Sequence, residues 1–203
     1  KYASPYVDPL TFLCVRFTLA AALFGVIAIA SRVAWPSTRA GWRHAILSGV
    51  FLHGIYLGGV WWAIEQGVPT PVSGLIAALQ PLPRLLALDA AMLQVALIPL
   101  LINVVAMASV AFGTIYQKRY LQEGDLRAIA ALQYVGGLLV VLPLALVFEP
   151  LRIVWSLEFA LAMGWSVLGL SLVSIMLLLY LIRRGQVSRA ASLTYLVPPA
   201  VAV

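Results

Sequence analysis

Two polar rings, His53 and Tyr56, lie three residues apart in an almost entirely apolar stretch. On an α-helix this spacing places both side chains near one face. A polar ring among apolar residues is costly unless it meets a cavity or a partner, so this pair is the first candidate for lining a ligand site. The alternative is that His53 only hydrogen-bonds a neighbouring helix.

Other aromatic side chains could complete such a site. Trp61 and Trp62 close the same stretch, where a cavity wall and an interfacial aromatic belt are equally good explanations. Trp62 aligns with Tyr180 when the sequence is shifted on itself by about 118 residues. Trp165 is either a cavity wall or an interfacial anchor.

Prolines interrupt two apolar stretches beside polar side chains. Gln80 precedes Pro81, and Tyr195 precedes Pro198. Proline removes a backbone donor and frees carbonyl groups, which an apolar environment tolerates only where protein or a wet cavity satisfies them. We therefore expect Gln80 and Tyr195 to line a central site, with a packing kink as the alternative. Asn103, deep in another stretch, either lines the site or bonds across helices.

Arg16 is the one cation deep inside an apolar stretch, and it needs a partner or a water-filled face. A structural pairing is the favoured interpretation. The sequence contains no phosphate-binding GxxxxGK[ST] loop, no HExxH zinc helix and no Asp or Glu in mid-stretch. We expect no catalytic residues, no metal and no cofactor, which argues against an ATP-driven pump and a metalloprotease.

The composition indicates a membrane as the solvent for these elements. Apolar residues make up 63% of the chain and charged residues 10%, with a mean hydropathy of +1.02, whereas soluble domains have about 25% charged residues. The apolar runs of roughly 18–25 residues match the thickness of a bilayer core. The net charge of +6 comes from Lys and Arg at the ends of these runs, so we expect no nucleic-acid partner.

The runs predict an all-α polytopic membrane protein with about seven spans in this sequence. Their connections are short and contain turn residues. The predicted spans are 9–31, 45–66, 70–88, 94–117, 127–148, 158–182 and 189–203.

An internal repeat organises the spans. A shift of about 118 residues aligns GVPTPVSGLIAALQP with GQVSRAASLTYLVPP, and a shift of about 117 places Asp8 on Asp125 and Arg16 on Gln133. Several spans lack a counterpart under this shift. We therefore expect a break in the sequence near 89–93 and further spans beyond both ends, so that residues 1–88 and 94–203 belong to two five-helix repeats.

The distribution of basic residues supports this arrangement. With a break near residue 89, only Lys1 and Arg152 face one side, and the positive-inside rule places the other loops in the cytoplasm. Corresponding loops of the two halves then lie on opposite sides, which makes the repeat inverted. Inverted repeats are typical of secondary transporters, whose substrate site lies near mid-membrane. The cytoplasmic set is Arg32, Arg39, Arg43, Arg84, Lys118, Arg119, Arg127, Arg183, Arg184 and Arg189.

Three segments carry a resemblance to a known family. YVDPLTFLCVRFTLAAALF resembles its second helix, WWAIEQGVPTPVSGLIAALQPL its third and fourth, and LYLIRRGQVSRAASLTYLVPPAVAV its eighth and ninth. The family is the drug/metabolite transporter (DMT) superfamily, EamA type. The resemblance implies ten spans in two inverted five-helix repeats, with helices 2–4 and 6–9 present here, and it favours similarity to bacterial amino-acid exporters.

The resulting hypothesis is a secondary transporter, not an enzyme, in a bacterial inner membrane. It would move a small polar metabolite, with amino acids first, by alternating access, as a monomer that needs only its substrate and the lipid bilayer. The alternatives are a drug or other-metabolite exporter of the same fold, a channel-like protein, and a membrane-embedded enzyme in which His53 acts with Ser171 or Ser174.

Overall fold

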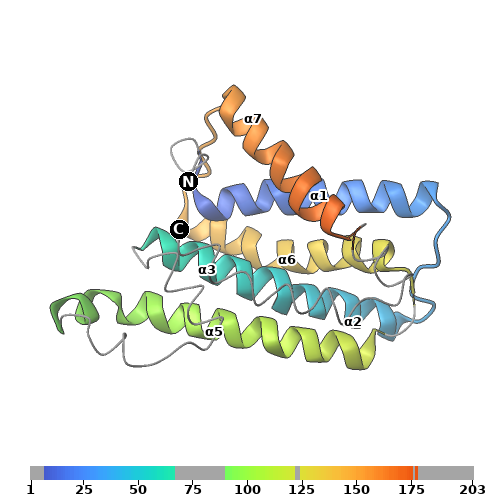
Figure 1. Cartoon of the computed structure of the whole chain (residues 1–203), viewed down its shortest axis with the longest axis horizontal. Coiled ribbons are helices and arrows are strands. Elements are labelled where there is room, and N and C mark those ends of the chain that lie inside the picture. The colour runs from blue at the N-terminus through green and yellow to red at the C-terminus, as the bar shows by residue number, and fades with distance from the viewer. Residues whose placement is uncertain (1–6, 67–89, 122–123, 176, 178–203) are drawn as a thin grey trace.

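The computed structural model describes residues 7–66, 90–121, 124–175 and 177, with the side chains of its longest helix described from Ile98 onward. These residues form a helical bundle without β-strands, apart from an isolated bridge between Val7 and Ile153 (Figure 1). The helices and π-helical segments are α1 (Pro9–Ala30), α2 (Arg39–Gly49), η1 (Val50–Ile55), α3 (Tyr56–Glu65), α5 (Ala90–Tyr120), α6 (Leu126–Phe148), α7 (Leu157–Gly164) and η3 (Trp165–Val173).

Four of these helices are long and apolar enough to cross a membrane. They are Pro9–Ala30, Arg39–Glu65, Ile98–Tyr120 and Leu126–Phe148, and the second joins α2, η1 and α3 into one rod. The apolar helix Leu157–Val173 is shorter. The prediction of a polytopic α-helical membrane protein is therefore confirmed, while the spans predicted at 70–88 and 189–203 lie outside the described residues, as does residue 89 itself.

The second span begins earlier than the predicted residue 45. Thr38 caps α2, because its hydroxyl accepts a hydrogen bond from the Gly41 N–H at 3.0 Å. This cap satisfies one of the orphan donors of the first turn and starts the helix within a polar segment. The apolar pattern in the sequence marks only the membrane-embedded part of this helix. The predicted start at residue 45 was therefore wrong, because the helix begins at Arg39. The helix predicted at 94–117 is likewise longer, extending from Ala90 to Tyr120.

The start of α1 is held by a residue from the far end of α6. Both carboxylate oxygens of Glu149 accept hydrogen bonds from α1, one from the Leu10 N–H at 2.7 Å and the other from the Thr11 N–H and hydroxyl at 2.6 Å. An anion at a helix N-terminus also interacts favourably with the helix dipole. This contact joins the first turn of α1 to the end of α6.

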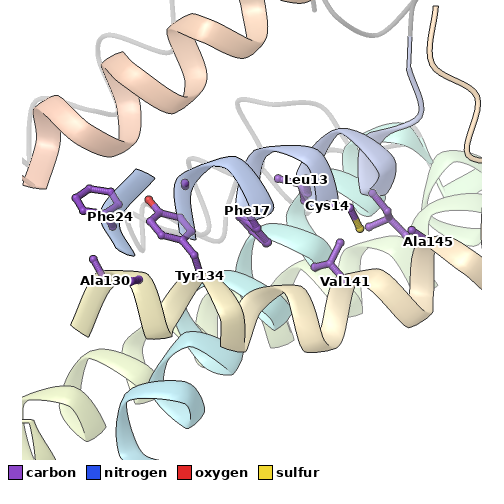
Figure 2. Packing of buried hydrophobic residues seen from close by; sticks show 11 residues of the cluster. Leu13, Cys14, Phe17, Phe24, Ala130, Tyr134, Val141 and Ala145 are labelled. Atoms are coloured by element: carbon purple, nitrogen blue, oxygen red, sulfur yellow. The ribbon is translucent and has the colours of Figure 1, made fainter. Parts of the chain in front are cut away.

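The centre of the bundle is the antiparallel pair of α1 and α6 (Figure 2). Along α1, buried residues recur three or four positions apart and face a row of mostly small residues on α6. Small side chains let the two backbones approach closely, which is how helices associate within lipid. Figure 2 shows Leu13, Cys14, Phe17 and Phe24 facing Ala130, Tyr134, Val141 and Ala145.

A tight crossing joins α6 to α2. A Cβ atom on Gly49 would overlap the Gln133 carbonyl oxygen, and one on Gly136 would overlap the Ile46 carbonyl oxygen. The Gln133 side chain donates a hydrogen bond to the Ser48 hydroxyl at 3.0 Å across this crossing. Glycine on both helices is therefore what allows the two backbones to touch.

Candidate functional site

His53 stacks against an aromatic ring of the second half of the chain. Its imidazole lies 4.6 Å from the Tyr134 ring, measured between centroids, with 13° between the planes. Phe17 closes the group at 5.8 Å from His53 and 5.9 Å from Tyr134. The rings come from η1, α6 and α1. The Nδ1 atom of His53 is buried and has no hydrogen-bond partner among the described residues.

A π-helical turn positions His53. Within η1 the Phe51 carbonyl accepts the N–H of Tyr56, five residues on, and also accepts the Ser109 hydroxyl of α5 at 2.9 Å. Single π turns are rare and are often found at functional sites. Gly137 of α6 leaves room beside this turn, because a Cβ there would come within 2.8 Å of the His53 Cβ.

Arg16 lies beside this aromatic group, one residue before Phe17. Its side chain is only 9% exposed. Nη2 donates a long hydrogen bond of 3.4 Å to the Ser171 hydroxyl on η3, and Nε is buried without a partner in the part of the chain that the structure describes. The neighbour of Arg16, Phe17, contacts both His53 and Tyr134. We call Arg16, Phe17, His53, Tyr134 and Ser171 the central cluster.

Ser171 positions Arg16 rather than His53. Its hydroxyl donates to the Ser166 carbonyl at 3.4 Å within η3 and accepts from Arg16. Ser174 is exposed. The predicted structural pairing of Arg16 is thus present, but its partner is a neutral hydroxyl at long distance, which compensates little of the cost of burying a cation.

Trp61 belongs to the interior of the bundle. Its ring stacks on Phe12 at 5.3 Å with 11° between the planes, and Phe159 of α7 meets Phe12 edge-on at 6.3 Å. Trp62 is half-buried against the core between α1 and α6. Both tryptophans therefore pack against the bundle, about one turn beyond Gly58 in the span Arg39–Glu65 that also carries His53.

Three other candidates lie among the described residues. Tyr56 is half-buried at the start of α3, where the π turn before it changes the helical spacing from His53. Asn103 is completely buried in α5. Trp165, at the start of η3, is 71% exposed. Of the predicted binding residues, His53 is the one that belongs to the central cluster, through its contacts with Phe17 and Tyr134.

The sequence profile of the EamA-like transporter family matches residues 97–203, which is more than half of the chain. The chain belongs to the EamA-like transporter family. It is therefore a membrane transporter of the drug/metabolite type, from a family of transporters rather than of enzymes. No curated protein and no solved structure matches the chain.

Three candidates of this EamA-like chain fall outside the described residues. Gln80 lies within 67–89, and Tyr180 and Tyr195 lie within 178–203. Their assignment to the site stays a prediction.

His53 is the one member of the central cluster that the sequence predicted to bind substrate, and two other members were not singled out at all. Tyr134 and Phe17 are ordinary aromatic residues in apolar runs, and nothing local distinguishes them. The internal shift of about 117 residues, however, places Phe17 on Tyr134 just as it places Arg16 on Gln133. Following the repeat along these two helices would have singled out the pair.

Proposed function

We propose that this EamA-like transporter carries a small carboxylate-bearing metabolite, with amino acids as the first candidates, and that Arg16 binds the carboxylate. The observation that carries the proposal is the Arg16 guanidinium, buried in the middle of α1 with one long hydrogen bond and an unpartnered Nε. Drugs and other metabolites without a carboxylate are the competing substrates.

The charged guanidinium of Arg16 is costly to place inside a bilayer. An arginine at the centre of a spanning helix costs about 2.5–3.5 kcal/mol on insertion scales, and it is usually compensated by an anion or water. By sequence, none of the seven acidic residues lies in the middle of an apolar run, and no described acidic residue forms an ion pair with Arg16. A substrate carboxylate would supply the charge, and it fits the planar fork of a guanidinium through two parallel hydrogen bonds.

The aromatic side of the central cluster suits the rest of such a substrate. Phe17 and the stacked pair of His53 and Tyr134 offer apolar ring faces, and the buried Nδ1 of His53 offers a polar atom. Ligand sites are commonly mostly apolar walls with a few polar groups that fix orientation. We infer that Arg16 fixes the carboxylate while these rings contact the side chain.

We further propose that the chain is built from two inverted repeats, and that these repeats move against each other to open the central site to each side of the membrane in turn. A shift of about 118 residues carries η1, Val50–Ile55, onto positions 168–173 within η3, so that both halves have a π turn at corresponding places. The same shift carries Ser48 onto Ser166. Ser48 accepts a buried hydrogen bond from Gln133 of α6, and the Ser166 carbonyl accepts one from Ser171 within η3. Substrate sites of such transporters lie between the repeats, where α1 and α6 meet.

The orientation follows from the ends of the bundle. The end of α1, the start of α2, the end of α5 and the start of α6 lie at the same end of the bundle (Figure 1). The basic residues of the described chain, apart from Arg16 and Arg152, lie in or beside these segments. By the positive-inside rule we propose that this end, called the basic end below, faces the cytoplasm of a bacterium, with Arg152 outside. The basic end contains Arg32, Arg39, Arg43, Lys118, Arg119 and Arg127.

Counterflow in proteoliposomes tests the substrate class. Vesicles loaded with an amino acid are assayed for uptake of the labelled amino acid, of its decarboxylated amine and of its amide. We expect saturable exchange of the amino acid alone. Because removing one partner of a buried charge pair costs about 2–5 kcal/mol, Arg16→Gln should lower kcat/KM about 100-fold, whereas His53→Ala should weaken exchange less.

The matched control is Arg152→Gln, which removes an exposed arginine at the other end of the bundle and should leave exchange unchanged. Equal exchange of amine and amino acid, or equal effects of Arg16→Gln and Arg152→Gln, would exclude the carboxylate role. No exchange of any amino acid by folded protein would exclude this substrate class and leave the family assignment untouched.

A further inference from the structure

A cavity of about 260 Å³ lies at the basic end, away from the central cluster. Its walls are the segment that leads into α2, the first turns of α2 and the last residues of α5, which meet on the right of Figure 1. The lining residues with polar or charged side chains are Ser37, Thr38, His44, Arg119 and Tyr120. No acidic residue is among the described lining residues.

Aromatic contacts fix the shape of this cavity. The His44 ring stacks on Tyr120 at 4.7 Å, and its Nδ1 is 2.6 Å from the Tyr116 hydroxyl. Trp42 stacks on Trp35 and donates a hydrogen bond to the Pro36 carbonyl at 2.9 Å, which holds the entry segment in place. Tryptophan with this mixed apolar and polar environment is typical of the membrane–water interface.

The charge in the cavity comes from Arg119. The guanidinium lies over the Tyr120 ring, 5.6 Å from its centroid, and makes no ion pair with any residue that the structure describes. Asp125, the described acid near this end, is held by Arg127 at 2.9 Å. The donors available for an anion include the guanidinium of Arg119 and the hydroxyls of Ser37 and Thr38.

The exposed face of α5 that leads to the cavity indicates what kind of molecule carries the anion. Large apolar side chains recur along this face at intervals of three or four residues, with one interval of seven, and are more than half exposed. The next position in the series is Arg119. A molecule with apolar chains along this stripe would therefore place its polar end at the cavity. The stripe consists of Ile98, Leu101, Val105, Phe112 and Ile115.

We propose that this cavity is a binding site for the phosphate of an anionic phospholipid, whose acyl chains lie along the α5 stripe. The shared chemistry is a phosphate on Arg119 and the hydroxyls of Ser37 and Thr38. The stripe favours a lipid over a free phosphate, because a soluble ion makes no favourable contact with an apolar surface. The site is separate from the central cluster and does not depend on what the protein transports.

The test measures lipid retained by the purified full chain. Protein is taken from bilayers containing equal amounts of phosphatidylglycerol and phosphatidylcholine, and bound lipids are counted by native mass spectrometry. We expect phosphatidylglycerol to be retained in preference. Because one cation near the surface contributes roughly 1 kcal/mol toward an anionic lipid, Arg119→Gln should reduce that retention about fivefold and Arg119→Lys should restore most of it.

Two further variants separate the possible sources of phosphate. Ile115→Ser, on the stripe, should also reduce retention of phosphatidylglycerol, whereas Arg152→Gln at the opposite end should not. Equal retention of both lipids, or an equal loss in Arg152→Gln, would overturn the site. Displacement of the lipid by inorganic phosphate at matched concentration, with no effect of Ile115→Ser, would make the ligand a soluble phosphate and overturn the lipid assignment.

Discussion

Two buried hydrogen bonds cross between the halves of this chain, and they differ in almost every respect. The bond from Gln133 to Ser48 is neutral, 3.0 Å long, and lies between helices whose glycines bring the backbones into contact. The bond from Arg16 to Ser171 is charged, 3.4 Å long, and leaves one guanidinium nitrogen without a described partner. The first has the properties of a structural contact between helices, and the second is where we propose that the substrate anion binds. Burial alone would not have distinguished them, since Gln133 and Arg16 are almost equally inaccessible.

The substitution with the largest expected effect disrupts the close crossing of α2 and α6. Gly136→Ala places a Cβ on the Ile46 carbonyl oxygen, and because the obstacle is backbone, the helices must separate. Overpacking typically costs about 1–3 kcal/mol and sometimes more, and we expect the upper end of this range. Thermal unfolding of detergent-solubilised protein measures the loss.

Gly25→Ala is the matched control for this substitution, because a Cβ there meets nothing within 4 Å on another spanning helix. It should leave stability unchanged or raise it by about 0.5–1 kcal/mol, since alanine favours the helix. A similar loss in both variants would show that the α2–α6 crossing has no special role.

The next substitution is at Arg16, and it is expected to leave the melting temperature unchanged or raise it instead of lowering it. Arg16→Met fills a similar volume without charge, and Ser171 keeps its hydrogen bond to the Ser166 carbonyl. Replacing buried ionic groups by apolar ones is often neutral or stabilising by about 1–4 kcal/mol, so the melting temperature should stay or rise while exchange is lost. A clear drop in melting temperature would make Arg16 a structural residue and contradict the comparison.

The smallest expected effect on stability comes from removing the hydrogen bond between Gln133 and Ser48. Gln133→Leu removes the hydrogen bond to Ser48 but keeps an apolar side chain of similar size. Hydrogen bonds between membrane helices average about 0.6 kcal/mol, with about 1.7 as the maximum, so a loss in this range is expected with unchanged substrate selectivity. Unfolding and counterflow are measured on the same preparation, and a change in selectivity would place Gln133 in the site.

The sequence predicted the membrane-embedded elements well, because apolar run length is set directly by bilayer thickness. The span predicted at 9–31 is α1, Pro9–Ala30, and the one at 127–148 is α6, Leu126–Phe148. The start of α2 was missed because it depends on the cap by Thr38, whose contribution lies in one hydrogen bond rather than in hydropathy. The π turns were missed as well, since no residue type specifies them.

The site was predicted only in part, for a geometric reason. His53 and Arg16 stood out because a polar or charged group in an apolar run is costly wherever it lies. Tyr134 and Ser171 matter only because α6 and η3 bring them next to those residues, and which helices meet cannot be read from one span at a time. Trp165 shows the converse, since a conspicuous residue type lies on an exposed face.

The carboxylate of Glu149 has a mechanical consequence. Glu149 directly follows the last turn of α6, and its three hydrogen bonds to the first turn of α1 would have to break before the two helices could slide past each other. We therefore propose that α1 and α6 move as one body during transport, so that the surrounding helices, two of which contain π turns, make the motions that open the protein to either side.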